Sequence, residues 1–281
     1  MRRKKTGTIG LVIPDNSNLF FAFLAKYLDD ILSLDNFNII VSNTSYDINK
    51  EIDTLATLRS KKVDGIIIVP ETTEPQFIDS IVKSGIPICI IEREIPGGNF
   101  DTVLIDNKSA MIEATEHLIQ LGHANIGYMD RKIDKSHSIE RKKGYLTTLS
   151  KYNIPVKEEF ILRSGFSSED GYEAAKYFLN CSKKITAILT SGDFAALGSI
   201  KYIYNKGLNV PKDISIVGWA DIPISPFTIP SLTTVRYPIT DIVNSIVDIL
   251  LAKIKNPDLT ETKKVVLKTQ LIIRDSTAQC N

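Results

Sequence analysis

The stretch Thr8-Ile-Gly-Leu-Val-Ile-Pro-Asp-Asn-Ser-Asn-Leu-Phe-Phe21 decides the fold of this chain. Its first six residues, Thr8–Ile13, form a continuous apolar run that is too short for a helix and is typical of a parallel strand buried on both faces. Residues 14–18 have turn chemistry, and apolar residues then recur at steps of three and four, which predicts an amphipathic helix. A polar turn between a strand and a helix lies at the carboxyl end of the sheet, where open α/β folds bind ligands.

Two adjacent aromatic residues, Phe20 and Phe21, stand within a residue or two of this turn. Adjacent positions on a helix do not both face the sheet, so we expect at least one ring to be free to line a crevice. The alternative is that both rings pack against a neighbouring loop, and this stretch alone favours neither interpretation.

Strand and helix patterns alternate along the rest of the chain. The expected strands are 38–42, 64–69, 86–91, 102–105, 125–129, 160–163, 187–190, 214–217, 233–236, 265–268 and 270–274. The expected helices are 47–60, 76–83, 110–121, 139–152, 168–179, 194–206 and 239–254, with Gly122 as a left-handed cap and Ser168 as an N-cap. Repeated βα units predict parallel sheets with helices on both faces, and about ten units are too many for one open sheet. We therefore expect an α/β protein of two similar lobes, with the chain crossing back after the Pro-containing segment 222–230.

The composition is that of an ordinary folded protein, with 281 residues, 43% hydrophobic residues and a formal net charge of +1. So small a charge gives no field that would hold the whole chain on nucleic acid or a membrane. Cys89, Cys181 and Cys280 are odd in number and far apart, which argues against disulfides and metal binding and favours a reducing, cytoplasmic compartment. Neither a secretory signal nor a membrane-spanning run is visible. The basic run Arg2-Arg-Lys-Lys5 is either a solvated terminus or a linker to a segment further upstream.

The sequence contains no motif that indicates catalysis. Phosphate-binding glycine loops, a nucleophile elbow and the His and Cys patterns of zinc sites are all missing. His117 lies within an expected helix and His123 follows the helix-ending Gly122, so both are expected to be structural. We expect neither a metal nor a cofactor, and nothing supports an enzyme, although a site assembled from distant residues would leave no such motif.

Polar and aromatic residues stand just after the expected strands. They are Glu92-Arg93-Glu94, Asp106-Asn107, Phe166, Gly192-Asp193 and Trp219-Ala220-Asp221, with His137 and Arg141 near the start of a helix. Each of these positions also has an alternative interpretation. Charged loop residues are commonly solvated. Asp106-Asn107 also suits the cap of a helix beginning near Ser109, and Trp219 also suits the core. Aromatic rings together with Arg, Asn and Asp side chains are typical of a site for a sugar-like or base-like ligand, with Arg141 as the strongest donor.

Motifs spread over nearly the whole chain carry a family resemblance. They are the opening stretch 9–21, Val63-Asp-Gly-Ile-Ile-Ile68, Asp106-Asn107, Glu116-His-Leu-Ile-Gln-Leu-Gly-His123, Arg141-x-x-Gly144-Tyr145, Gly171-Tyr-Glu-Ala-Ala175, Asp193-x-x-Ala-Leu-Gly198, Asp213-Ile-Ser-Ile-Val-Gly-Trp219, Ser231-Leu-Thr-Thr-Val-Arg236 and Leu271-Ile-Ile-Arg274. The chain resembles the effector-binding region of LacI-family (LacI/GalR) bacterial transcription repressors. The resemblance implies a periplasmic-binding-protein-like type I fold, with two Rossmann-like lobes, parallel sheets and three crossover segments. It implies an N-terminal lobe of residues 6–106 and 237–262, a C-terminal lobe of residues 107–236 and 263–281, and a hinge remnant at residues 1–5.

The same resemblance implies a function. It implies a transcriptional regulator of the repressor type that binds a small sugar-like effector in the interlobe cleft and passes lobe closure to a helix-turn-helix head before Thr6. That head, which is missing here, would bind operator DNA. A homodimer, no membrane contact and no enzymatic activity are also implied. A solute-binding protein that feeds a sugar transporter has the same fold and remains the alternative, and an α/β enzyme of unrecognised chemistry is a third hypothesis.

Carried over by position, the effector contacts of the family fall in both lobes. They are Asn18, Phe20, Phe21, Glu92 and Arg93 in the N-terminal lobe, and His137, Arg141, Phe166, Gly192, Asp193, Ala220 and Asp221 in the C-terminal lobe. The family usually has Asn at the position of Gly192 and Asp at the position of Ala220, and both give polar contacts to a sugar. Without them there are fewer hydrogen-bond partners and more room. We therefore expect an effector that is larger, less polyhydroxylated or bound in a shifted pose.

Overall fold

The computed structural model describes residues 5–131 and 135–280. The chain divides into two compact units: unit 1 is Met1–Ile105 with Pro238–Leu267, and unit 2 is Asp106–Tyr237 with Lys268–Asn281. The chain thus crosses between units three times. The first two crossings lie within one residue of the expected positions, whereas the third lies at residues 267–268 and not after residue 262. The reason is β11 (Lys264–Leu267), which pairs with β5 (Asp101–Ile105) in the unit 1 sheet.

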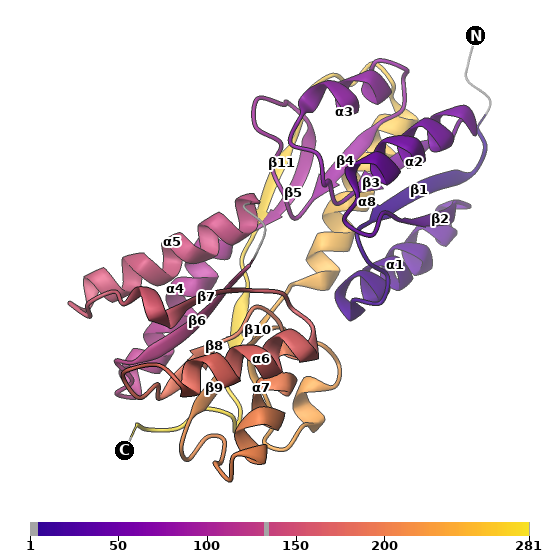
Figure 1. Ribbon diagram of the computed structural model, residues 1–281. Helices are drawn as coiled ribbons and strands as arrows, with labels where there is room; N and C mark the ends of the chain where they lie inside the picture. Colours follow the sequence, from indigo (N-terminus) through magenta and orange to yellow (C-terminus); the bar gives the residue numbers. More distant parts are fainter. Residues whose placement is uncertain (1–4, 132–134, 281) are drawn as a thin grey trace. The chain divides into compact units, whose positions relative to one another are not determined.

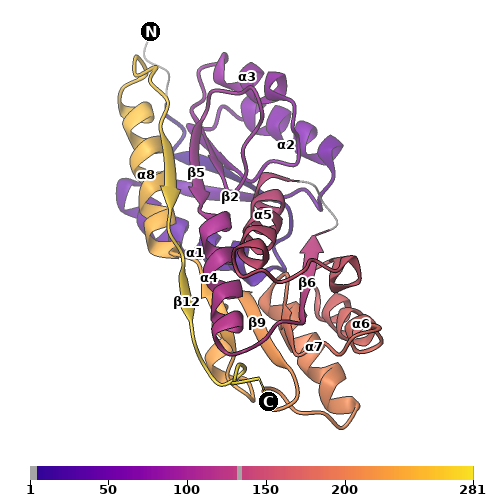
Figure 2. The same cartoon turned by 90° about the vertical axis from the view of Figure 1, so that its left-hand side faces the viewer.

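Unit 1 has one six-stranded parallel sheet between two layers of helices (Figure 1). Its other strands are β1 (Thr8–Ile13), β2 (Asn38–Asn43), β3 (Gly65–Ile68) and β4 (Ile88–Ile91), in the sheet order β11-β5-β4-β3-β1-β2. Its helices are α1 (Leu19–Leu32), α2 (Ile48–Ser60), α3 (Pro75–Val82) and α8 (Ile239–Lys255). Helices α1 and α8 cover one face and α2 and α3 cover the other (Figure 2). Strands β3 and β4 are therefore apolar and buried on both sides.

Two glycines let helices approach this sheet closely from opposite faces. A Cβ atom at Gly10 would lie 2.6 Å from Leu58 Cδ1 on α2, and one at Gly65 would lie 3.0 Å from Leu250 Cδ1 on α8. Both leucines occupy the volume that a side chain on the strand would need. The glycines in the quoted motifs therefore serve helix packing in unit 1.

The chain enters unit 1 through a segment that is fastened to Asp64. The Asp64 carboxylate accepts hydrogen bonds from the backbone N–H groups of Thr6 (2.9 Å), Gly7 (2.7 Å) and Thr8 (3.3 Å). It also accepts a bond from the Thr6 hydroxyl (3.2 Å), and Asp64 itself is buried. One side chain therefore sets the direction in which residues 6–8 approach the sheet.

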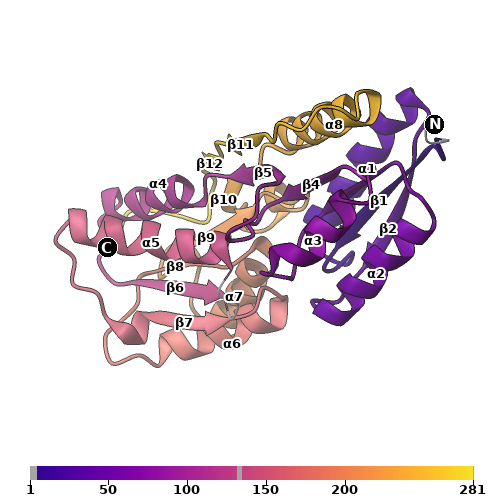
Figure 3. The ribbon, with the colours of Figure 1, turned by 90° about the horizontal axis from the view of Figure 1, so that it is seen from above.

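Unit 2 repeats this layered arrangement. Its strands are β6 (Ile126–Arg131), β7 (Ile161–Ser164), β8 (Ala187–Leu189), β9 (Ser215–Ala220), β10 (Thr233–Arg236) and β12 (Gln270–Ile272), in the order β12-β10-β9-β8-β6-β7. Its helices are α4 (Asn107–Gln120), α5 (Ser136–Lys151), α6 (Ser168–Leu179) and α7 (Asp193–Asn205). Helices α4 and α5 lie on one face of the sheet, and α6 and α7 lie on the other (Figure 3). The sheet departs from the expected parallel pattern in one strand, because β12 runs antiparallel to β10.

The ends of several elements differ from the predicted ends. The N-cap of α6 is Ser167 and not Ser168, because the Ser167 hydroxyl accepts a bond from the Asp170 N–H (3.1 Å) and the Asp170 carboxylate accepts one from the Ser167 N–H (3.1 Å). Asp106 caps α4 as expected, but the helix begins at Asn107, earlier than predicted. Three short 3-10 helices, which the apolar pattern does not predict, are η1 (Ser33–Asp35), η2 (Glu158–Phe160) and η3 (Ser225–Phe227).

Two histidines hold the segment that follows β12. His123 Nε2 lies 3.0 Å from the Ser215 hydroxyl and 3.1 Å from the Ala278 carbonyl oxygen. His117 Nε2 lies 3.0 Å from the Thr277 hydroxyl. Burial lowers the pKa of both imidazoles, so the neutral ring is favoured in each case. Both contacts are structural, as the sequence predicts.

Candidate effector-binding site

The carboxyl ends of the unit 1 strands carry a group of side chains that we call the unit 1 edge. It consists of Asn18, Phe20, Phe21, Glu71, Glu92 and Arg93. Asn18 is the N-cap of α1, and its side-chain oxygen accepts a hydrogen bond from the Phe20 N–H (3.0 Å). The rings of Phe20 and Phe21 pack edge to face with centroids 5.1 Å apart. Both rings are buried, with 9% and 3% exposed, so Phe20 is the better placed of the two to meet a ligand.

Glu92 and Arg93 follow β4 and are more than nine-tenths buried, with 8% and 2% exposed. Glu92 has a left-handed backbone conformation (φ 66°), and its N–H donates to the Val103 carbonyl (3.0 Å). Among the described residues, neither Glu92 Oε2 nor Arg93 Nε has a hydrogen-bond partner. Two consecutive residues therefore present a buried acceptor and a buried donor with unused bonding capacity, a condition that is rare in folded proteins.

A residue that the sequence analysis did not select, Glu71, holds Arg93 in place. Arg93 Nη1 forms a buried ion pair with Glu71 Oε1 and donates to the Pro70 carbonyl (2.7 Å). Glu51 on α2 accepts hydrogen bonds from the backbone N–H groups of Glu71 (2.6 Å) and Thr72 (3.0 Å), so the turn after β3 is fixed as well. Burial raises the pKa of the Glu51 carboxyl, and the charge of Glu71 adds to this effect.

The carboxyl ends of the unit 2 strands carry a second group, the unit 2 edge. It consists of His137, Arg141, Phe166, Gly192, Trp219 and Tyr237. His137 lies in the first turn of α5 and is buried, with its Nε2 3.4 Å from Arg131 Nη1. The Arg131 guanidinium also lies over the Phe166 ring, with Cζ 4.9 Å from the ring centroid. Phe166, which lies in a loop, therefore packs against the positively charged side chain of Arg131.

Arg141, the donor that the sequence ranks first, is bonded within unit 2. Its Nε donates to Asn107 Oδ1 (2.9 Å), its Nη2 to the Tyr237 hydroxyl (2.6 Å) and its Nη1 to the Ser191 carbonyl (3.4 Å). Arg141 Cζ lies 4.0 Å from the centroid of the Trp219 ring, and Trp219 Nε1 donates to the same Tyr237 hydroxyl (2.9 Å). All five residues are buried. The sequence suggested that Trp219 follows the strand, but the residue lies inside β9.

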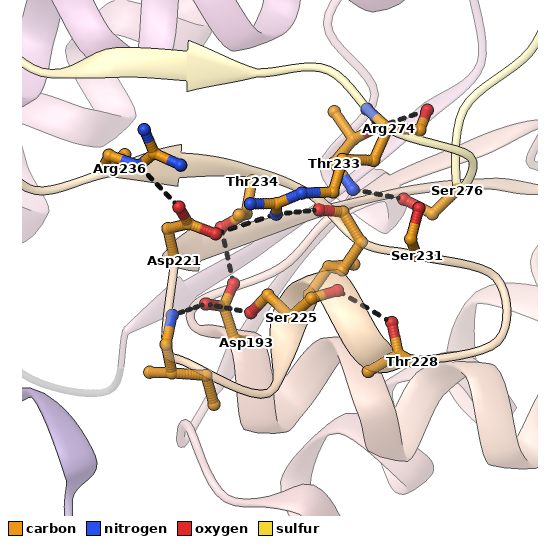
Figure 4. Close-up of polar contacts among 12 residues, drawn as sticks. Asp193, Asp221, Ser225, Thr228, Ser231, Thr233, Thr234, Arg236, Arg274 and Ser276 are labelled. Carbon is orange, nitrogen blue, oxygen red and sulfur yellow. Dashed lines mark hydrogen bonds and ion pairs between the residues drawn. The ribbon is translucent and has the colours of Figure 1, made fainter.

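Asp193 is a structural residue (Figure 4). Its carboxylate accepts hydrogen bonds from the Ile222 N–H (2.8 Å), the Ser225 hydroxyl (3.0 Å) and the Thr234 hydroxyl (2.6 Å). It is 2% exposed, and burial raises its pKa although these bonds act against the rise. Both carboxylate oxygens are thus used to hold the connection between β9 and β10. The predicted contact of Asp193 with an effector stays a prediction beside these internal bonds.

Asp221 is also bonded within unit 2 (Figure 4). Its carboxylate forms ion pairs with Arg236 Nε (2.6 Å) and Arg274 Nη1 (2.8 Å). Ala220 and Asp221 both have positive φ, 114° and 53°, a region that L side chains rarely adopt, so this turn is strained. The ion pairs direct the Asp221 carboxylate to β10 and to the segment after β12. They give Asp221 a structural role, and its predicted contact with an effector stays a prediction.

Gly192 leaves room for a Cβ atom in the unit 2 edge. It is the N-cap of α7 and has an extended backbone (φ −175°). A Cβ atom here would meet Phe166 Cβ at 3.8 Å and the Trp219 carbonyl oxygen at 3.9 Å, which are ordinary contacts. Packing therefore does not require glycine at this position, and its missing side chain adds room next to the Phe166 loop.

Sequence reasoning missed two residues of these edges and underrated a third. Glu71 and Tyr237 each stand at the end of a strand pattern, which is the signal that selected the other candidates. Trp219 was noted but not placed in the site. No local signal shows that one tyrosine hydroxyl accepts bonds from two residues far apart in the sequence, since that depends on the fold.

The side chains of the two edges are of the types that bind small polar ligands. Within the described part of the chain, no group of three His, Cys, Asp or Glu side chains is placed to hold a metal ion. Burial raises the pKa of the Cys89 thiol, which removes it as a nucleophile. In the same part of the chain, none of the helices combines the length and the apolar character needed to cross a membrane.

Comparison with known proteins agrees with the fold. The family model described as a periplasmic binding protein-like domain matches residues 115–277. Catabolite control protein A of Priestia megaterium is 33% identical over 98% of this chain and 82% of its own length. A LacI family transcriptional regulator from Enterococcus faecium, solved with bound ribose, has a TM-score of 0.88 at 29% identity, over 98% of this chain and all of the other. The chain belongs to the LacI family of transcriptional regulators.

A further LacI-family relative is the probable HTH-type transcriptional repressor ExuR of Bacillus subtilis (strain 168), with 32% identity over 97% of this chain and 81% of its own length. These relatives are transcriptional regulators and not enzymes, and they favour a regulator over a solute-binding protein that feeds a transporter. The chain is thus the effector-sensing part of a LacI-family regulator. The predicted architecture of two α/β units is confirmed.

Proposed function

We propose that this chain senses a small hydroxylated effector, a sugar or a sugar derivative, with contacts from both the unit 1 edge and the unit 2 edge. The effector favours the arrangement of the units in which both edges contact it, and this difference in affinity shifts the equilibrium between arrangements. The shift acts on a DNA-binding head joined before Thr6, and that head binds operator DNA.

The observation that supports this proposal best is the unused bonding capacity of Glu92 and Arg93. A sugar hydroxyl both donates and accepts, so sugar hydroxyls have the chemistry to donate to Glu92 Oε2 and to accept from Arg93 Nε. A buried polar atom without a partner costs about 1–3 kcal/mol, which an effector recovers on binding. The LacI-family regulator from Enterococcus faecium was solved with bound ribose, which supports the same ligand class here.

The side chains of the unit 2 edge support an effector whose end near unit 2 is less polar than its end near unit 1. Asp193 and Asp221 are bonded internally, and Gly192 and Ala220 have no polar side chain. Besides Arg141, the Phe166 ring and the room next to Gly192 remain for the ligand. The effector is therefore hydroxylated where it meets unit 1 and bulkier or more apolar where it meets unit 2.

A thermal-shift panel of sugars, sugar phosphates and nucleobases tests this function. A ligand present at a hundred times its dissociation constant stabilises the protein by about 2.7 kcal/mol, which raises the melting temperature measurably. The shift should be lost in Glu92→Ala and kept in the control Glu94→Ala, since Glu94 is an exposed residue that pairs with Lys264. A shift that survives Glu92→Ala would place the ligand elsewhere, and a panel without any shift would count against the proposed function. Any bound ligand should be recovered unchanged, because no turnover is expected.

We also propose that the protein is a homodimer. Ile224, Phe227 and Ile229 lie close together in the connection between β9 and β10, and Phe227 and Ile229 are 78% and 87% exposed. Apolar side chains gathered on a surface indicate a protein interface. In sedimentation velocity, Phe227→Glu should shift the protein to a monomer, whereas Val156→Glu, at another exposed apolar position of unit 2, should not.

The same function places the protein in the cytoplasm, where operator DNA lies, without membrane contact and without a cofactor. The net charge of +1 supports the view that the sensing part does not hold DNA by itself. A gel-shift assay with random duplex DNA at moderate salt should therefore show no retention by this chain alone.

A further inference from the structure

The hydroxyl of Tyr237 is a common acceptor for two donors that belong to different elements. It accepts hydrogen bonds from Arg141 Nη2 (2.6 Å) on α5 and from Trp219 Nε1 (2.9 Å) on β9. A tyrosine oxygen has two acceptor positions, and both are used. Arg141 and Trp219 are each 3% exposed, so solvent does not readily replace this hydroxyl as their partner.

Arg141 carries the connection to a distant part of the chain. Its Nε donates to Asn107 Oδ1 (2.9 Å). Asn107 is the second residue after the chain first enters unit 2, and Tyr237 is the last residue before the chain leaves it. One guanidinium therefore joins the unit 2 ends of two of the three crossings, although these ends are far apart in the sequence.

Geometry explains why this role needs an arginine and a tyrosine. The guanidinium is planar and donates in fixed directions, so two acceptors at its edge fix both its position and its plane. That plane lies on the Trp219 ring, with Cζ 4.0 Å from the centroid. Without the Tyr237 hydroxyl, Arg141 loses one of the acceptors that orient it, and the indole N–H loses its partner.

We propose that Tyr237 is the positioning residue of the unit 2 edge, which places Arg141 on Trp219 and couples this edge to the first two crossings. The connection from Asn107 through Arg141 to Tyr237 exists without a ligand. Its effect on effector binding rests on the proposed function, because Arg141 is a predicted effector contact.

Fluorescence tests the positioning role without a ligand. Trp219 is the only tryptophan of the chain, so its emission reports on this contact directly. Tyr237→Phe should move the emission to longer wavelength and make acrylamide quenching more effective. The control is Tyr145→Phe, which removes another buried tyrosine hydroxyl, bonded to the Ile126 carbonyl (2.8 Å). Emission and quenching of Tyr237→Phe equal to wild type would overturn the proposal, and so would an equal change in the control.

Hydrogen exchange read by mass spectrometry tests the coupling to the crossings. Tyr237→Phe should speed exchange in peptides covering residues 237–240 and also in peptides covering residues 105–109. The two sets of peptides are far apart in the sequence, and Arg141 donates to both Asn107 Oδ1 and the Tyr237 hydroxyl, so the second effect reports on this connection. Unchanged exchange at residues 105–109 would overturn the coupling. A loss of protection throughout unit 2, including α6, would do the same, since it would show general loosening.

Binding measurements separate this inference from the proposed function. D-ribose, D-glucose and glucose 6-phosphate are titrated into wild type and Tyr237→Phe by calorimetry. Where a sugar binds the wild type, Tyr237→Phe should weaken it about tenfold, equal to about 1.4 kcal/mol, and an unchanged affinity would overturn the role of Tyr237 in binding. If none of these or the panel sugars binds the wild type, the proposed function fails, while fluorescence and exchange still decide the role of Tyr237.

Discussion

The unit 1 edge and the unit 2 edge differ in what their charged residues do. In unit 1, Glu92 and Arg93 each keep a buried polar atom without a partner among the described residues. In unit 2, Asp193, Asp221 and Arg141 bond to other groups of the same unit. Charged residues after a strand are thus equally suited to bind a ligand or to hold a loop, and only their partners distinguish the two roles. From this comparison we expect unit 1 to give most of the polar recognition, and unit 2 to give shape and stacking besides the predicted contact of Arg141.

Asp193→Ala should have the largest effect and should act on stability. The substitution leaves the Ile222 N–H and the Ser225 and Thr234 hydroxyls without their common acceptor, which should cost about 3–5 kcal/mol. Urea denaturation followed by circular dichroism measures the change. Ser225→Ala removes only one of the three donors and should cost about 1 kcal/mol. A stable Asp193→Ala that has lost effector binding would remove the contrast between the edges.

Arg141→Ala should come second, with effects on both binding and stability. We expect effector binding to weaken by about 1.5–3 kcal/mol, the scale of a charge-assisted hydrogen bond. Stability should fall as well, because Asn107 and Tyr237 lose a buried partner. Calorimetry and urea denaturation measure the two quantities separately. Unchanged affinity would remove Arg141 from the site, and unchanged stability would contradict its structural bonds.

Gly192→Asn sharpens the comparison by giving the unit 2 edge a polar side chain. Since a Cβ atom fits here at ordinary distances, stability should change by less than about 0.5 kcal/mol. Affinity for a hydroxylated ligand should rise by about 0.5–1.5 kcal/mol through one added hydrogen bond. Gly165→Ala is the contrasting control, because its Cβ would overlap the Asp170 carboxylate and should destabilise the protein. A strongly destabilised Gly192→Asn would show that the space is not available.

The contribution of the histidines to the pH dependence of stability should be the smallest effect and should arise in unit 2. All three histidines, His117, His123 and His137, belong to unit 2. Burial lowers the pKa of His123 below its usual value, so the unfolded chain binds the proton more readily. The stability that the neutral His123 ring contributes is fully present above the ordinary pKa of about 6.5, and it is lost as the pH falls below that value. Urea midpoints at pH 7.5 and pH 5.5 should differ less in His123→Gln than in wild type, and an equal difference would contradict this.

The positions of the elements could be predicted because they follow from local patterns. Strand β10 and helix α6 have their predicted bounds, and Gly122 has the left-handed φ of 87° that a helix end requires. The third crossing was placed too early because nothing local shows that β11 pairs with β5 in unit 1. Pairing of strands depends on the whole sheet, and a short apolar run fits either unit.

The partners of the candidate site residues could not be predicted in the same way. Aspartate and arginine commonly bind sugars, and they also commonly hold loops. The residue types of Asp193, Asp221 and Arg141 therefore fit either role. The Thr234 hydroxyl donates a hydrogen bond to Asp193. Thr234 is distant in the sequence and becomes a neighbour only when β9 and β10 pair. Glu92 could be selected from its position after β4 alone, but its unused Oε2 atom is visible only in three dimensions.

The attachment of residues 6–8 to Asp64 has a mechanical consequence. Three backbone N–H groups donate to one buried carboxylate, so residues 6–8 are held to unit 1 and must follow any movement of it. Asp64→Ala should release this segment, and faster hydrogen exchange of the amides of residues 6–8 would show it.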